Sequence, residues 1–278
     1  MIENEPIGGV KFCTLNLSDT IALLADWSGS GQTVSLDLFN RNLVKEAGRS
    51  SNSGARWFAC VNPHSVENAR RHPEVKKAIE SADLVTADGT GVVVGSILLG
   101  GRVRERVCGP DIFPMLCEYL NAQKAGTRMF FLGTNDATLS ALEKKFGEVY
   151  PHLELAGAFA PPYRKQFSEK EHLIMVERIN ASSADVLWVG LGAPKQELWC
   201  YHNAHRLNVK LIGPVGGVFD FFTGRVNLPP KWVQRFGMIS LYRLCQEPRR
   251  LWRRNLDTPI FLMRVMWQLI RQGRYPST

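Results

Sequence analysis

Short apolar runs alternate with longer amphipathic stretches from residue 56 onward, and this alternation constrains the fold more than any other feature of the chain. The runs that we expect to form strands are 57–61, 84–87, 128–132, 153–158, 186–191 and 210–214. The expected helices between and after them are 66–81, 92–99, 137–150, 170–182 and 198–207. Alternating strands and helices form parallel sheets covered on both faces. We therefore predict an α/β fold with a Rossmann-like, mostly parallel sheet, helices on both faces and a helical, basic C-terminal appendage.

The ends of the chain are less regular than this central part. Residues 10–27 read as a short strand followed by a helix, and residues 41–54, rich in Ser, Gly, Asn and charge, read as a loop. The first six residues contain Glu3 and Glu5 instead of a basic run followed by an apolar one, so we expect no secretory signal and a cytoplasmic location.

Composition excludes several classes of protein. No stretch reaches the roughly 20 apolar residues that a membrane-spanning helix needs. The six cysteines form no CxxC pair and have no His at metal-ligand spacing, which argues against a zinc site and a disulfide framework. We expect free thiols and no bound metal.

The positive charge is concentrated at one end of the chain. Ten Lys or Arg stand against two acids after residue 230, an excess that equals the formal net charge of +8 for all 278 residues. In that segment, arginines are interleaved with aromatic and other bulky apolar residues, the pattern of a helix in a membrane interface. A helix packed on the body with a solvated basic face is the alternative, and nucleic acid is another anionic partner.

Polar residues and glycines follow five of the predicted strands. Ligands of such sheets bind beyond the carboxyl ends of the strands, so these residues are the ones to read for chemistry. The segments are Asn62-Pro63-His64, Asp88-Gly89-Thr90-Gly91, Gly133-Thr134-Asn135, Gly192 to Gln196, and Gly216 to Asp220.

Each of these segments has two interpretations. Asp88 follows a strand directly, so its carboxylate either accepts a proton in the cleft or caps the next helix. The glycines either bring backbone amides to a diphosphate or only make tight turns, and no dinucleotide or P-loop fingerprint is complete. Lys195 and Gln196 either contact a sugar or phosphate or lie in a solvated first turn of a helix. Arg106 reaches a phosphate or belongs to an exposed basic loop.

Together, these motifs resemble the WecG/TagA/CpsF glycosyltransferase family between about residues 58 and 254. The matching motifs include Asn62-Pro63, Asp88-Gly89-Thr90-Gly91, Glu105-Arg106-Val107, Gly192 to Trp199, Val215 to Phe221, and Glu247 to Arg254. The resemblance implies an inverting transfer of a sugar from a UDP-sugar to a polyprenyl-diphosphate-linked sugar, without an obligatory metal or other cofactor. The expected donors are of the N-acetylmannosamine, glucose or glucuronate type.

The resemblance also implies roles for individual residues. Asp88 matches the general base. Asn62, Arg106 and Gln196 match residues of the donor-sugar and phosphate region, and Asp220 matches one near the nucleoside. From their places around the strand ends we also expect substrate-binding roles for Cys60, Thr90, Gly91, Gly133, Gly192, Lys195 and Gly217. The residues expected to close over the diphosphate from the membrane-docking appendage are Arg243, Arg250 and Arg253. The family often carries Thr where this chain has Cys60, which changes the hydrogen-bonding group at that position.

We predict three parts in the chain. Residues 1–55 belong to the main domain, residues 56–228 form the catalytic core, and residues 229–278 form the basic appendage. The expected partners are the two substrates and an anionic membrane surface at the inner face of the cell membrane, with homo-oligomers as a further association. A non-catalytic nucleotide-binding module and a nucleic-acid-binding protein that uses the basic tail are the rival interpretations.

Overall fold

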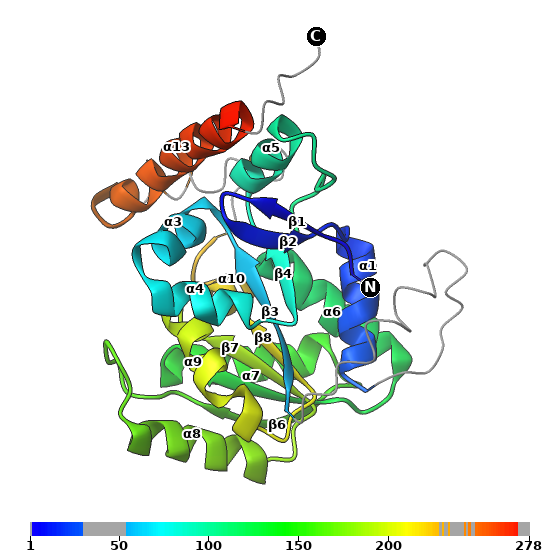
Figure 1. The fold of residues 1–278 in the computed structure, drawn as a ribbon. Coiled ribbons are helices and arrows are strands. Elements are labelled where there is room, and N and C mark those ends of the chain that lie inside the picture. The colour runs from blue at the N-terminus through cyan, green and yellow to red at the C-terminus, as the bar shows by residue number, and fades with distance from the viewer. Residues whose placement is uncertain are drawn as a thin grey trace.

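The structure is a computed structural model that describes residues 2–29, 54–227, 230, 233, 242, 244, 245 and 248–271; of 250, 251, 253 and 254 only the backbone is described. Its centre is a six-stranded, all-parallel sheet with the strand order β4-β3-β8-β7-β5-β6, shown in Figure 1. The strands are β3 (Arg56–Val61), β4 (Leu84–Ala87), β5 (Arg128–Gly133), β6 (Glu154–Phe159), β7 (Val186–Gly190) and β8 (Leu211–Pro214). The predicted fold class is confirmed.

Both faces of the sheet are buried except at the edge strand β6, as the continuous apolar runs of the other strands require. Alternate side chains enter different cores: Phe130 and Leu132 of β5 point into one, whereas Met129 and Phe131 point into the other. Helices that contribute to the first core are α3 (Pro63–Arg71), α4 (Pro73–Glu80), α5 (Thr90–Leu98), α8 (Glu169–Ala181), α9 (Lys195–Asn203) and α13 (Pro248–Arg271). Helices of the second core are α1 (Leu17–Trp27), α6 (Gly109–Gln123), α7 (Asp136–Val149) and α10 (Val218–Phe222). A 3₁₀ turn, Ala204–Arg206, follows α9.

Proline positions explain two errors in the predicted helices. The helix expected over 66–81 is two helices, because Pro73 restricts His72 to an extended conformation (φ −130°, ψ 100°) and starts α4 anew. Helix α6 was not predicted, although Pro110 lies in its first turn, where proline is well tolerated. Pro114 lies inside α6, and the helix still continues because its buried face, which includes Phe113 and Leu116, packs in the core.

The N-terminal strand is not part of the main sheet. β1 (Asn4–Ile7) and β2 (Val10–Cys13) form an antiparallel hairpin, and β1 was not predicted. The helix α1 confirms the expected helix after β2. Except for Gly54, the loop expected over 41–54 lies outside the described residues.

Helix α13 packs against α3 and α5 (Figure 1). Phe261, Val265 and Leu269 are buried at four-residue spacing, so one stripe of α13 joins the core. None of the described helices combines the length and apolar character needed to cross a bilayer.

Candidate active site

Asn62 and Asp88 lie together at the carboxyl ends of β3 and β4. Asn62 Oδ1 accepts a hydrogen bond from the backbone N–H of Ser65 at 3.1 Å, so the side chain is the N-cap of α3. Its amide Nδ2 donates to Asp88 Oδ2 at 3.1 Å. The N-cap of α5 is Gly89, with a φ of +102°, and Asp88 is the residue before it. Asp88 therefore lies at the carboxyl edge of the sheet beside Asn62.

Two thiols lie close to this carboxylate. Burial raises the pKa of Cys60 and of Cys108 well above the ordinary value, and the negative charge of Asp88 adds to both shifts. Cys60 Sγ also accepts a long hydrogen bond, 3.5 Å, from Thr86 Oγ1. Both thiols are therefore protonated at neutral pH and act as small neutral groups beside Asp88.

Arg106 supplies a cation at the same edge of the sheet. The backbone N–H of Val107 donates to Ala87 O at 2.9 Å, which fixes the segment against the end of β4. The Arg106 guanidinium is largely buried and donates to Asp111 Oδ2 at 3.0 Å. The positive charge of Arg106 opposes the rise in the pKa of Cys108, so the guanidinium lies near this thiol.

Gln196 and Glu197 form a buried polar pair at the start of α9. Gln196 is 5% exposed and Glu197 is 3% exposed, and Gln196 Nε2 donates a hydrogen bond to Glu197 Oε1 at 3.0 Å. The amide oxygen of Gln196 faces Gly216, where an added Cβ would lie 3.4 Å from it, and accepts no hydrogen bond among the described residues. The charge of Glu197 raises the pKa of Cys60, so the pair lies near this thiol.

Glu197 was missed as a site residue by the sequence analysis. The signal that could have found it is its place in α9, because Gln196, Glu197, Trp199, Cys200 and Asn203 form the buried face of that helix. A carboxylate on a buried helical face is rare and is most often functional or paired.

Glycines allow close approach where β5 and β7 end. Gly133 has a φ of +125°, and an added Cβ would lie 2.5 Å from Gly190 O. β5 leads outward to β6 while β7 leads to β8 on its other side, so the connections diverge here. Gly192, with a φ of +78°, forms the turn into α9 and accepts a hydrogen bond from Gln196 N. Such divergence points are where open α/β sheets bind ligands.

Three other predicted site residues lie in the first turns of α9 and α5. Lys195 Nζ donates to Arg164 O at 2.7 Å and lies 3.7 Å from the Phe167 ring centroid, and burial lowers its pKa. Thr90 is exposed, whereas Gly91 packs against Pro63.

A second polar group lies near the starts of α7 and α10. Asp220 lies 3.6 Å from Arg225 Nη1, which donates to Thr138 Oγ1 of α7 at 3.0 Å. Gly217, the N-cap of α10, is exposed and has open space beside it. The sequence motif between residues 216 and 220 thus joins the start of α7.

The arginines expected from the appendage are not among the described side chains. Arg243 lies outside the described residues, and only the backbone of Arg250 and Arg253 is described, at the start of α13. Within the described part of the chain, no three His, Cys, Asp or Glu side chains gather so as to hold a metal ion.

Comparison with known proteins shows the family of this chain. A sequence model of the Glycosyl transferase WecG/TagA/CpsF family matches residues 32–275. The chain is 31% identical over 215 residues to an N-acetylglucosaminyldiphosphoundecaprenol N-acetyl-beta-D-mannosaminyltransferase of Bacillus spizizenii, covering 77% of this chain and 80% of the relative. It is 28% identical over 209 residues to a protein of the same name from Bacillus subtilis, covering 75% and 78% of the two chains. With a strand-end carboxylate, a nearby cation and this match over most of its length, the chain belongs to the WecG/TagA/CpsF family of glycosyltransferases.

Proposed function

We propose that this glycosyltransferase moves a sugar from a UDP-sugar to a polyprenyl-diphosphate-linked sugar, with inversion at the anomeric carbon, in the synthesis of an exopolysaccharide, capsule or wall polymer. Among the N-acetylmannosamine, glucose and glucuronate donors, the names of both relatives favour N-acetylmannosamine. They also favour N-acetylglucosaminyl-diphosphoundecaprenol as the acceptor. The hydrogen bond between Asn62 and Asp88 at the carboxyl edge of the sheet carries the proposal.

Asp88 is the general base in this reaction. Its carboxylate takes the proton from the acceptor hydroxyl while the hydroxyl oxygen attacks the anomeric carbon. The bond between that carbon and the diphosphate oxygen breaks, and UDP leaves with the electron pair. Asn62 orients the base, because its amide also caps α3 and is thereby fixed in position.

The leaving diphosphate gains negative charge as the bond breaks. Arg106 and the backbone amides of the glycine turns at Gly133, Gly192 and Gly217 stabilise this charge, with the appendage arginines Arg243, Arg250 and Arg253 completing the set. In this proposal the protein supplies the cationic groups and no metal is required. Turnover that persists at an undiminished rate in excess EDTA would support this point, whereas a loss restored by a divalent cation would overturn it.

The first test is acceptor-dependent UDP release by the full chain in detergent, with UDP-sugars supplied one at a time. We expect release with UDP-N-acetylmannosamine and the lipid-linked N-acetylglucosamine acceptor. Asp88→Asn should lower kcat by about 10²- to 10⁴-fold, the usual worth of general-base catalysis, with donor binding retained. UDP binding without any turnover across the panel would favour the binding-module alternative.

We also propose that α13 docks the protein on an anionic membrane. Its outward side carries an apolar stripe of exposed side chains, and Ile97 of α5 is exposed as well. The stripe consists of Trp252, Leu256, Met263, Met266, Trp267 and Ile270. Arg271 lies 3.4 Å from the ring centroid of Trp267, so a cation accompanies the apolar face. Aromatic and basic side chains together suit the headgroup region of a bilayer.

Competition between anionic liposomes and duplex DNA tests this surface. We expect retention on the liposomes and no protection by DNA, and the reverse would favour the nucleic-acid alternative. In the absence of lipid, we expect the exposed stripe to promote self-association, which sedimentation measures directly.

A further inference from the structure

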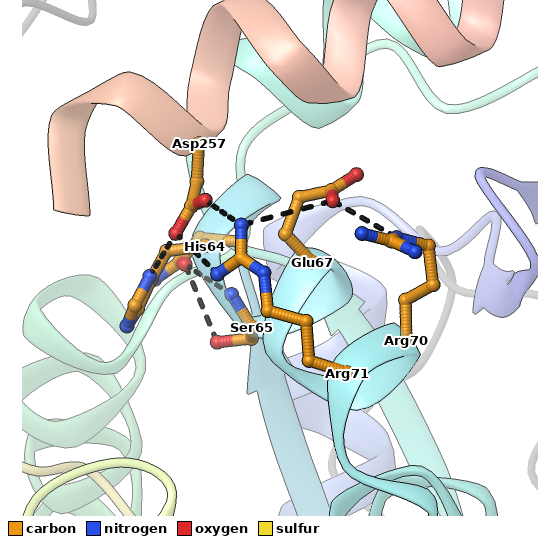
Figure 2. Close-up of polar contacts among 7 residues, drawn as sticks. His64, Ser65, Glu67, Arg70, Arg71 and Asp257 are labelled. Carbon is orange, nitrogen blue, oxygen red and sulfur yellow. Dashed lines mark hydrogen bonds and ion pairs between the residues drawn. The ribbon is translucent and has the colours of Figure 1, made fainter. Parts of the chain in front are cut away.

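Asp257 of α13 is a buried carboxylate that contacts the first and last turns of α3. Figure 2 shows it facing His64 and Arg71. His64 Nδ1 lies 2.5 Å from Asp257 Oδ2, and Arg71 donates to both carboxylate oxygens. The residue is 3% exposed. These contacts join positions that are 193 and 186 residues apart in the chain.

Two neighbours of Asp257 extend this contact to α5. An added Cβ on Gly91, in the first turn of α5, would lie 2.7 Å from Pro63 Cγ and 3.3 Å from Thr258 Cγ2. An added Cβ on Gly95 would lie 3.2 Å from the ring of Phe261. The turn of α13 that carries Asp257 therefore packs on the beginnings of both α3 and α5.

These two helix beginnings hold the proposed catalytic pair. Asn62 is the N-cap of α3, two residues before His64, and Asp88 directly precedes Gly89, the N-cap of α5. The Asn62–Asp88 hydrogen bond spans the two helix starts. A shift of α3 relative to α5 would change that bond before it changed the sheet.

A buried charge is a weak means of holding helices together, because the desolvation of both partners offsets much of their attraction. The apolar contacts of Phe261, Val265 and Leu269 already attach α13 to the core. Asp257 instead fixes the orientation of α13 relative to α3. Its two carboxylate oxygens contact groups at opposite ends of α3, so both contacts form in only one arrangement of the two helices.

We propose that Asp257 is a positioning residue of the active site, which holds the start of α3 against α5 and so fixes the geometry of Asn62 and Asp88. The expected loss of kcat rests on the proposed function. The expected change in the geometry of Asn62 rests on the hydrogen bonds alone. Asp257 thereby gives α13 a role inside the catalytic centre in addition to its outward apolar face.

Asp257→Asn tests the proposal, with Arg264→Gln as the matched control. Arg264 Nε lies 3.0 Å from Glu67 Oε1, so the control also removes an ion pair between α13 and α3, away from the N-cap of α3. For Asp257→Asn in detergent we expect kcat to fall by about 10- to 100-fold, as small misplacements of catalytic groups do, while the donor KM changes little. Arg264→Gln should keep the parental kcat.

Amide hydrogen exchange gives a readout that does not depend on turnover. The Ser65 N–H, which is bonded to Asn62 Oδ1, should exchange faster in Asp257→Asn than in the parent, and should be unchanged in Arg264→Gln. Equal Ser65 exchange in all three proteins, or equal losses of kcat in both variants, would overturn the positioning role. Absence of turnover by the parental chain would instead refute the proposed reaction.

If Asp257→Asn fails to fold, His64→Gln takes its place, because His64 is partly exposed and its loss leaves the Arg71 contact intact. A lower kcat with the parental melting temperature would support the proposal. Parental kcat in a folded His64→Gln protein would overturn it.

Discussion

The amide of Asn62 donates one hydrogen bond to Asp88 Oδ2 while its carbonyl oxygen accepts another from the Ser65 backbone. The side chain of Asn62, the residue that follows β3, thus caps α3 and also orients the proposed base. Capping and catalysis can be separated by substitution, because a carboxylate caps a helix as well as an amide but cannot donate to Asp88.

Asn62→Asp should therefore keep the stability of the protein and lose activity. Its carboxylate repels Asp88 and raises the pKa of the base, so the acid limb of the pH–rate profile should move to higher pH. Asn62→Ala should lose the cap as well, at a cost of about 1 kcal/mol in the free energy of unfolding. Thermal melts and kcat against pH measure both effects, and parental activity in Asn62→Asp would contradict the role given to this bond.

Gln196 and Glu197 should act as a unit. The Glu197 carboxylate accepts from Gln196 Nε2 and so turns the amide oxygen toward Gly216. We expect Gln196→Ala and Glu197→Gln each to raise the donor KM, and the double variant to cost little more than either single change. Independent effects that simply add would show that Glu197 does not orient Gln196.

Gly133 should not tolerate a side chain. Its φ of +125° and the approach of Gly190 O to 2.5 Å from an added Cβ predict that Gly133→Ala destabilises the fold by about 3 kcal/mol or more. Gly147, within α7, has open space beside it, so Gly147→Ala should stabilise by about 0.5–1 kcal/mol. Denaturant unfolding of the two variants measures the contrast, and equal midpoints would refute it.

Asp257 should make part of the stability depend on acid pH. Burial acts to raise its pKa, but hydrogen bonds from Arg71 and His64 outweigh burial, so the pKa lies below its ordinary value. Glu67 contacts the same Arg71 on α3 and also pairs with Arg70 and with Arg264 of α13. A lowered folded pKa gives stability that is full above the ordinary value of about 3.9 and lost as the pH falls through the folded value.

The melting temperature of the parent should therefore approach that of Asp257→Asn as the pH falls below about 4, because a protonated aspartate resembles asparagine. Above this range the parent should be the more stable of the two. A difference in melting temperature between the parent and Asp257→Asn that stays constant down to the lowest pH would rule out this dependence of stability on the protonation of Asp257.

The exposed stripe of α13 should govern liposome binding. Met263→Glu and Trp267→Glu place a charge on the outward face and should reduce retention on anionic liposomes. Leu173→Glu introduces the same charge at an exposed leucine on α8, away from α13 (Figure 1), and should have no effect. Sedimentation with liposomes measures the retention of all three variants. Retention equal to that of the parent in Met263→Glu and Trp267→Glu would show that α13 is not part of the docking surface.

The sequence by itself determined the class of fold and most of its elements. Strands buried on both faces must be continuous apolar runs, so β3, β4 and β7 were visible as such, and the polar residues after them marked Asn62, Asp88 and Gln196 as candidate site residues. Local rules failed where packing overrode them, as in α6, which keeps Pro114 inside the helix because its apolar face is buried.

Only the tertiary structure decided which of these residues meet. The strand order places β3 beside β4 and brings Asn62 to Asp88. In the first turn of α9, Lys195 contacts Arg164, whereas the neighbouring Gln196 faces Gly216. The pairing of Asp257 with His64 joins segments 193 residues apart. Periodicity along the chain records whether a residue is buried, but the partner of a buried polar group is fixed by the packing of elements distant in sequence, which no local pattern encodes.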